Sequence, residues 1–197
     1  PQNPKTPNTR KITIRNTYFH VTLWFAMMFL MTISMVYSIK HLGKPSQQND
    51  LIASETANIG LFFGILGLVT GMIWAQFTWG AFWVNDVKTN GTAITLLIYF
   101  AYTVLRGSVE DDEKRGRIAA VYNIFAFVML VLFLGILPRV NDSLHPGNGG
   151  NPAFGNYDMD NTMRMVFYPA IIGYFLMGLW FVDHRIRLKK IEQKLTV

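Results

Sequence analysis

The sequence predicts an all-α integral membrane protein, and three observations support this class. Hydrophobic residues make up 51% of the 197 residues and charged residues only 15%, against about 25% charged residues in soluble domains. The apolar residues gather in long runs, and the Lys and Arg residues lie mostly at the ends of these runs. Basic residues in such positions anchor helices on anionic lipid headgroups. We therefore expect residues 1–197 to form a single polytopic membrane domain.

Five apolar runs are long enough, or nearly so, to cross a bilayer, which takes about 20 apolar residues. They cover residues 18–39, 57–75, 91–105, 118–137 and 165–182. The third run is short, so we expect it to extend back into the preceding loop or to lie beside a loop that dips into the membrane. The fourth run stops at Pro138. In the second run, Gly60 and Gly64 lie four residues apart, which predicts close helix packing in lipid.

The distribution of Lys and Arg orients these runs. The link after the first run, the link 106–117 and the tail 185–194 are rich in basic residues, and alternation places all three on one side. The positive-inside rule predicts that this side is the cytoplasm. The opposite side receives residues 1–16, the 76–90 loop and the 138–164 loop. Because a basic N-terminal stretch is awkward on the outer side, we expect a sixth transmembrane helix upstream of residue 1.

Two histidines lie on the predicted outer side and are candidate ligands. His20 opens the first run, and His145 precedes a turn rich in Gly, Pro and Asn. Neutral imidazole is a common metal ligand, and two imidazoles can occupy both axial positions of a haem iron. The alternative is that both are ordinary interface residues. We interpret His41 and His184, beside basic residues at the inner ends, as solvated side chains.

Four of the five tryptophans fall near the outer interface: Trp24, Trp74, Trp79 and Trp83. An aromatic belt enriches tryptophan at both interfaces, so this one-sided placement favours a stacking surface for a flat ligand. Trp24 follows His20 by four residues and therefore shares its helical face. Trp79 and Trp83 have the same spacing and would share a face if their loop were helical.

The polar residues of this loop admit plain interpretations as well. Asp86 and Lys88 could be a simple solvated pair. Alternatively, Asp86 orients a neighbouring hydrogen-bond donor. Asn85, Asn90 and Gly91 fit a turn, since Asn and Gly suit such positions.

Three stretches, taken in order, resemble the cytochrome c maturation protein C (CcmC) family, within the haem-handling superfamily marked by a tryptophan-rich WWD segment. They are "YFHV" at 18–21, "GLVTGMIWAQFTWGAFWVNDVKTN" at 67–90 and "SLHPGNGG" at 143–150. The resemblance covers nearly the whole chain. It implies an outer WWD-type segment at about 74–91 and an outer histidine loop at about 138–162.

The resemblance implies transient, non-covalent binding of haem b at the outer face of the bacterial inner membrane. Haem then passes to a periplasmic haem chaperone during c-type cytochrome biogenesis. The implied partners are that chaperone, the subunits of a haem-associated ABC transporter and a small membrane accessory subunit. The implied role is that of a carrier rather than an enzyme, with a lyase-like role left open.

The resemblance also implies roles for individual residues. His20 and His145 become the candidate iron ligands. From the chemistry of haem we further expect Trp24 to line the stacking platform with Trp79 and Trp83. The residues that map onto the WWD pattern are Trp79, Gly80, Trp83 and Asp86. The chemistry of haem, beside the resemblance, leads us to expect that one or more of Lys88, Arg139 and Arg15 meet the propionates.

The sequence departs from the family pattern at several of these positions. Thr22 replaces the usual proline, Asn85 replaces the tryptophan before the acid, and Lys88-Thr89-Asn90 replaces Arg-Leu-Thr. Lysine keeps the positive charge but lacks the bidentate fork of arginine, so a propionate contact at Lys88 is geometrically less defined.

Two alternative functions remain at this stage. One is a haem-handling subunit of a cytochrome c synthase, which usually has more histidines, some of them within the membrane. The other is a cofactor-free structural membrane subunit whose aromatic loop docks a partner helix. The absence of cysteine excludes thiol catalysis, disulfides and covalent thioether attachment of haem to this chain.

Overall fold

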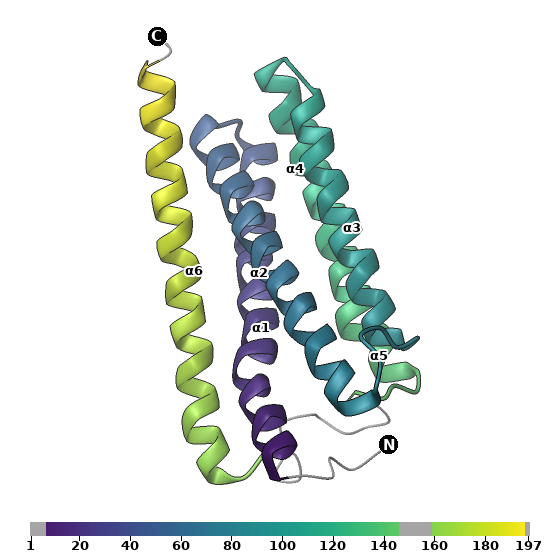
Figure 1. Cartoon of the computed structure of the whole chain (residues 1–197). Coiled ribbons are helices and arrows are strands. Elements are labelled where there is room, and N and C mark those ends of the chain that lie inside the picture. The colour runs from purple at the N-terminus through teal and green to yellow at the C-terminus, as the bar shows by residue number, and fades with distance from the viewer. Residues whose placement is uncertain (1–6, 146–158, 196–197) are drawn as a thin grey trace.

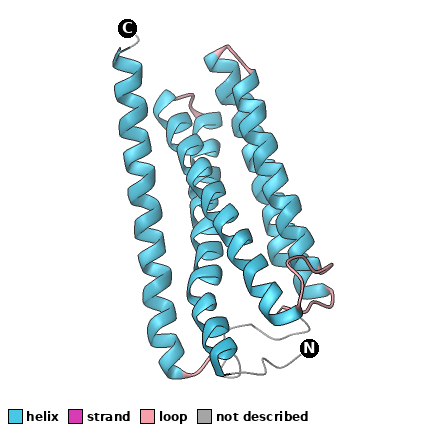
Figure 2. Ribbon diagram, in the orientation of Figure 1, coloured by secondary structure: helices cyan, strands magenta, loops and turns pink. Residues whose placement is uncertain are grey.

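The computed structural model describes residues 7–145 and 159–195, with side chains from residue 14 onward. The described part is built of helices joined by short loops (Figure 2). The helices are α1 (Pro7–Gly43), α2 (Gln47–Trp79), α3 (Val87–Ser108), α4 (Asp112–Leu130), the π-helical turn η1 (Val131–Ile136), α5 (Leu137–Val140) and α6 (Asn161–Leu195). This architecture confirms the predicted all-α class.

Within the described ranges, four segments are long and apolar enough to cross a membrane, judged by length and composition. They are Ile14–Gly43, Gln47–Trp79, Asp112–Val140 and Asn161–Leu195. The third predicted run lies in α3, which has 22 residues. This helix begins at Val87, within the preceding loop. The first of the two expectations for the short run, extension back into that loop, is therefore confirmed.

The helices form an elongated bundle with the α1–α2 hairpin in its middle, α3 and α4 on one side and α6 on the other (Figure 1). The α1–α2 link, the α3–α4 link and the C-terminal end of α6 lie at one end. The loop 80–86 and the segment 141–145 lie at the opposite end, which we call the site end. The two groups of loops therefore separate as the alternation of the apolar runs predicted.

A row of glycines on α2 allows α1 to approach closely. The facing pairs are Gly60 with Met31, Gly64 with Met27, Gly67 with Trp24, and Gly71 with His20. At each of these glycines an added Cβ would lie between 2.6 and 3.0 Å from the α1 side chain, closer than packed carbons allow. Small residues of this kind bring transmembrane helices together where lipid removes the hydrophobic driving force. The packing role predicted for Gly60 and Gly64 is confirmed, and it extends two further steps along α2.

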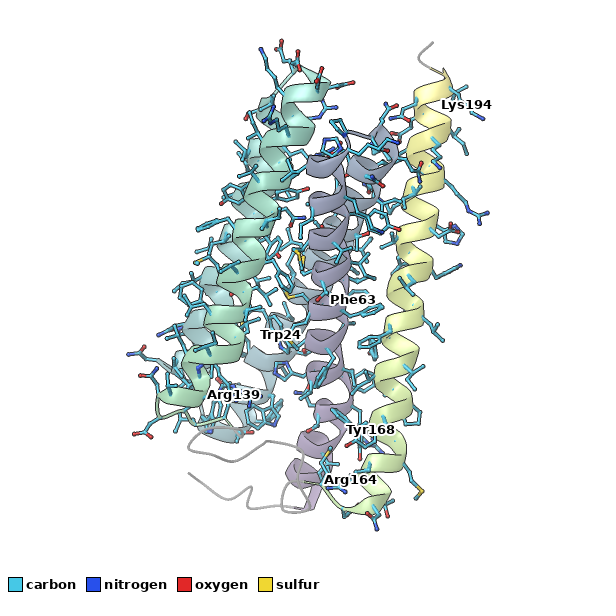
Figure 3. All side chains as sticks on the ribbon, turned by 180° about the vertical axis from the view of Figure 1, so that it is seen from behind. Trp24, Phe63, Arg139, Arg164, Tyr168 and Lys194 are labelled. Atoms are coloured by element: carbon cyan, nitrogen blue, oxygen red, sulfur yellow. The ribbon has the colours of Figure 1, made fainter. Side chains whose placement is uncertain are left out.

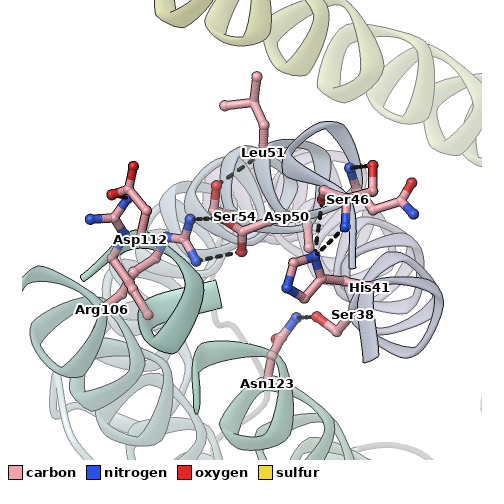
Figure 4. Close-up of polar contacts among 12 residues, drawn as sticks. Ser38, His41, Ser46, Asp50, Leu51, Ser54, Arg106, Asp112 and Asn123 are labelled. Carbon is pink, nitrogen blue, oxygen red and sulfur yellow. Dashed lines mark hydrogen bonds and ion pairs between the residues drawn. The ribbon is translucent and has the colours of Figure 1, made fainter. Parts of the chain in front are cut away.

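Polar contacts join the helices near the end opposite the site end. Such contacts hold transmembrane helices together and satisfy groups that lipid would leave unpaired. They are Asp50–Arg106 between α2 and α3, Asn123 with Ser34 and Ser38 between α4 and α1, and Glu55–Arg185 between α2 and α6. Figure 4 shows the first of these contacts and the bond from Asn123 to Ser38.

Two histidines at this end have different surroundings. His41 is buried, and its Nδ1 lies 3.0 Å from the carbonyl oxygen and 3.3 Å from the amide nitrogen of Ser46 (Figure 4). The interpretation of His41 as a solvated side chain was therefore wrong, because the chain turns back over it after α1. His184 is exposed, as expected.

The end of α4 widens before Pro138 instead of stopping there. Proline has no N–H to offer the carbonyl four residues back, and its ring crowds that carbonyl. The chain forms the π-helical turn η1, in which the Leu137 amide bonds to the Leu132 carbonyl, and stays helical to Val140. Gly91 of α3 packs against this turn, since an added Cβ would lie 2.8 Å from the Phe133 carbonyl oxygen. The contact fixes the start of α3 at the site end.

The α1–α2 packing gives a direct stability test. In Gly64→Leu, the new side chain would meet Leu96 Cδ2 and Met27 Sδ, which lie 2.7 and 2.8 Å from an added Cβ. Overpacking of this kind costs about 1–3 kcal/mol, so thermal unfolding in detergent should shift to a lower temperature. Gly173→Leu is the matched control, because nothing lies within 4 Å of its Cβ position on α6. Equal unfolding temperatures for the two variants would contradict this packing.

Candidate functional site

A cavity lies at the site end between α1, α2 and α3. It is lined by His20, Trp24 and Met28 of α1; Leu68, Gly71, Met72, Ala75 and Trp79 of α2; Phe82 and Val84 of the loop; Lys88, Thr89 and Thr92 of α3; Leu134 of η1; and His145. In Figure 3, Trp24 lies within the bundle toward this end, and Arg139 lies nearer the tip. The cavity brings together the two histidines that the sequence placed on one side.

His20 is anchored to the backbone of α2. Its Nδ1 lies 2.9 Å from the carbonyl oxygen of Gly67 and 3.3 Å from Oγ1 of Thr70. A carbonyl oxygen only accepts, so the proton sits on Nδ1 and points at Gly67. The other ring nitrogen, Nε2, therefore keeps its lone pair, which is the state that a metal ligand needs.

Two glycines of α2 leave room for the side chains of His20 and Trp24. An added Cβ at Gly71 would lie 2.6 Å from Cε1 of His20, and one at Gly67 would lie 2.8 Å from Cε2 of Trp24. The two α1 rings meet edge to face, with centroids 6.2 Å apart. Any larger residue at Gly71 would displace the imidazole from the carbonyl that orients it.

Asp86 collects four hydrogen bonds at the start of α3. Its Oδ1 accepts the Leu144 amide at 2.8 Å, and its Oδ2 accepts the Lys88 amide at 2.9 Å, the Ser143 hydroxyl at 3.1 Å and Nδ1 of His145 at 3.0 Å. The Lys88 contact caps α3. Burial alone would raise the pKa of the carboxyl, but these donors outweigh burial and the pKa of Asp86 lies below its ordinary value. Asp86 is therefore a carboxylate at neutral pH.

His145 is a neutral imidazole in this environment. Burial lowers the pKa of His145, the Asp86 carboxylate opposes this by charge and hydrogen bonding, and the charge of Lys88 adds to the lowering. The net pKa lies below the ordinary histidine value. Because Nδ1 donates to Asp86, Nε2 is the nitrogen with the free lone pair.

Two tryptophan rings enclose the imidazole of His145. Trp79 meets it edge to face, with centroids 4.9 Å apart and planes at 75°. Trp74 lies 6.1 Å away, and the two indoles contact each other at 4.7 Å. Trp79 also lines the cavity, so it contacts the histidine and forms part of the wall.

The other predicted site residues have distinct positions. Gly80 ends α2 in the left-handed conformation, with φ of 81°, and its amide bonds to the Gln76 carbonyl, a common glycine helix end. The loop that follows is not helical, so Trp79 and Trp83 do not share a helical face. Trp83 is 43% exposed and lies outside the cavity lining. Lys88 lines the cavity, whereas Asp86 does not.

Sequence reasoning missed several residues of the site. Gly67 and Gly71 continue the row begun by Gly60 and Gly64, so extending the small-residue pattern would have indicated them. Ser143 carries no comparable signal, because its contact with Asp86 spans 57 residues of the chain. The outer histidine loop at 138–162 falls partly outside the described residues, so its Gly-rich turn has no structural account.

Comparison with known proteins identifies the family of this chain. The family model of heme exporter protein C (CcmC) matches residues 5–197. The chain belongs to the CcmC family. It is 26% identical to heme exporter protein C of Paracoccus denitrificans over 167 residues, which cover 85% of this chain and 69% of the relative. The Escherichia coli protein of the same name is 25% identical over 88% of this chain and 69% of the relative.

Other relatives match shorter parts of this CcmC-family chain. Heme exporter protein C of Bradyrhizobium diazoefficiens is 28% identical over 60% of this chain, and the match covers 45% of that relative. Cytochrome c biogenesis protein CcsA of Prochlorococcus marinus is 32% identical over 91 residues, or 46% of this chain and 28% of the relative. The matched segments thus cover between 45% and 69% of these CcmC relatives.

The environment of His145 predicts a specific pH response. In a histidine-resolved NMR titration, we expect His145 to titrate below the usual value of about 6.5, because burial disfavours its charged form. Since the unfolded state then binds the proton more readily, the free energy of unfolding should fall as the pH drops from about 6.5 toward the lowered value. Asp86→Asn removes an attraction and should lower the pKa further. A midpoint above 6.5, or a rise in the variant, would contradict this description.

Proposed function

We propose that this chain binds haem in the cavity at the site end and hands it to a periplasmic haem chaperone during c-type cytochrome biogenesis. The observation that carries the proposal is the pairing of His20 and His145 across one cavity. Each donates from Nδ1 to its own acceptor and keeps Nε2 free. Membership of the CcmC family supports the same class of cargo.

The residues of the cavity fit the chemistry of haem. Two neutral imidazoles offer reversible axial bonds to the iron, and His20 and His145 supply them without a proton having to leave Nε2 first. Trp24 and Trp79 offer flat aromatic area for the apolar face of the macrocycle. Since the chain has no cysteine, it forms no thioether bond with haem and can release it intact.

The cationic side chains at this end suit the haem propionates. Lys88 lines the cavity, and the charge of Arg139 acts on Lys88. Arg15 is exposed on α1. We propose Lys88 as the first contact for a propionate, with Arg139 and Arg15 as further cations. The predicted contact of Trp83 with haem stays a prediction, because Trp83 is not among the residues that line the cavity.

We infer that the site end faces the periplasm of the bacterial inner membrane, since the opposite end carries most of the basic residues. The bound species is non-covalent haem b. Its proposed partners are the periplasmic chaperone, the subunits of a haem-associated ABC transporter that takes part in release, and a small accessory membrane subunit. The chain acts as a carrier rather than an enzyme.

A second candidate function is a haem-handling subunit of a cytochrome c synthase. The similarity to cytochrome c biogenesis protein CcsA over 91 residues supports it. Co-purification separates the two: a carrier is recovered with a haem chaperone, and a synthase subunit with an apocytochrome.

The ligand assignment predicts the spectrum of the purified protein. In His20→Ala, His145→Ala, both axial ligands are lost, so the Soret band should shift and the haem content should fall. His184→Ala is the matched control, because His184 is exposed on α6 near Trp180 at the other end. A double variant with the haem content and spectrum of the unmodified protein would refute the assignment. A protein free of haem under all conditions would support the structural-subunit alternative.

Gly71 gives a second test, because the three atoms nearest to its Cβ position all belong to the His20 ring. Gly71→Ala places a Cβ 2.6 Å from the imidazole. Displacing a ligand at a cost of about 1.4 kcal/mol corresponds to tenfold weaker binding, which haem titration would measure. Gly173→Ala, with open space around its Cβ position, should bind like the unmodified protein. Equal affinities in both variants would argue against His20 as a ligand.

A further inference from the structure

We propose that Asp86 is a positioning residue, which aims His145 at the cavity and does not itself contact haem. The inference rests on the proposed function, and it gives the acid of the tryptophan-rich loop a role different from that of a cofactor contact. It follows from the hydrogen bonds, the burial and the placement of this one carboxylate.

The carboxylate of Asp86 is engaged by donors of the protein itself. Its Oδ2 accepts hydrogen bonds from Lys88, Ser143 and His145, and its Oδ1 accepts one from the Leu144 amide. The side chain is only 2% exposed and lies outside the cavity lining. A negative group would also repel the haem propionates. The Asp86 carboxylate therefore faces other groups of the protein and not the cavity proposed to hold haem.

What Asp86 does contact is the segment that carries the ligand. It caps α3 through the Lys88 amide and at the same time holds the Leu144 amide and the Ser143 hydroxyl. His145 is 59 residues away in the sequence. One carboxylate thus ties the 143–145 turn to the start of α3, whose position is fixed in turn by Gly91 against η1.

The same contact sets the direction of the free nitrogen. With Nδ1 bound to Oδ2 of Asp86 and the ring faced by Trp79 at 4.9 Å, the imidazole can neither rotate nor exchange its tautomer freely. A carboxylate partner also makes a ligating histidine more basic than a carbonyl partner does. His20 bonds to the Gly67 carbonyl, so the two ligands differ in donor strength, with His145 the stronger.

The rival explanation is that Asp86 only caps a helix. Asp111 provides the matched control, because its side chain caps α4 by accepting the Lys114 amide at 2.8 Å. It lies in the α3–α4 link, at the end away from the cavity. Each of Asp86→Ala and Asp111→Ala loses a helix cap, and Asp86→Ala also removes the acceptor of the donors at residues 143–145. Only Asp86→Ala should alter the haem spectrum.

A double-mutant cycle on the purified full chain tests the proposal, using haem affinity and the absorbance spectrum. Loss of such a partner typically weakens binding 10- to 100-fold, and we expect Asp86→Ala to lie in that range with the spectrum of His145→Ala. Adding Asp86→Ala to His145→Ala should cause no further loss. A further loss in the double variant, or a native spectrum in Asp86→Ala, would overturn the positioning role.

A second variant covers the case in which Asp86→Ala does not fold. Asp86→Asn keeps an oxygen that can accept Nδ1–H but removes the negative charge. We expect it to retain both ligands and to shift the reduction potential of the bound haem to more positive values, since His145 becomes a weaker donor. An unchanged potential would overturn the role of the charge. A native spectrum in His145→Ala would instead overturn the proposed function, and this inference with it.

Discussion

The close approach of α1 to α2 is the constraint on which the rest of this structure depends. Four glycines along one face of α2 leave room for Met31, Met27, Trp24 and His20 of α1. In lipid, where burial of apolar surface gives no advantage over contact with acyl chains, such packing and interhelical polar contacts hold helices together. The same row of glycines that lets α1 pack on α2 also leaves room for the His20 side chain. The packing of the two helices and the position of His20 are therefore set by the same surface.

The second histidine depends on a different kind of constraint. His145 follows a short helix and has no rigid element of its own, so its position comes from the Asp86 carboxylate and from the indoles of Trp74 and Trp79. The two histidines thus belong to parts of the bundle with different anchors: a backbone carbonyl for His20 and a buried carboxylate for His145.

Much of the fold could be predicted from the sequence, because the apolar runs and the basic residues at their ends are local signals. The shared side of His20 and His145 follows from alternation of the runs. The contact between Asp86 and His145 could only be guessed, since it joins segments 59 residues apart through tertiary packing. The loop after Trp79 could not be assigned because Gly80, with φ of 81°, ends the helix and directs Trp83 outward. His41 was misjudged because its burial depends on the return of the chain at Ser46.

The most direct test of this account is a structure of the haem-loaded protein in a lipid nanodisc, determined by electron cryo-microscopy. We predict haem density in the cavity at the site end, with Nε2 of His20 and of His145 on opposite faces of the iron. Nδ1 of His145 should still bond to Asp86, and the Asp86 carboxylate should make no contact with the macrocycle. Haem bound elsewhere on the bundle, or iron ligated by other residues, would contradict the central claim.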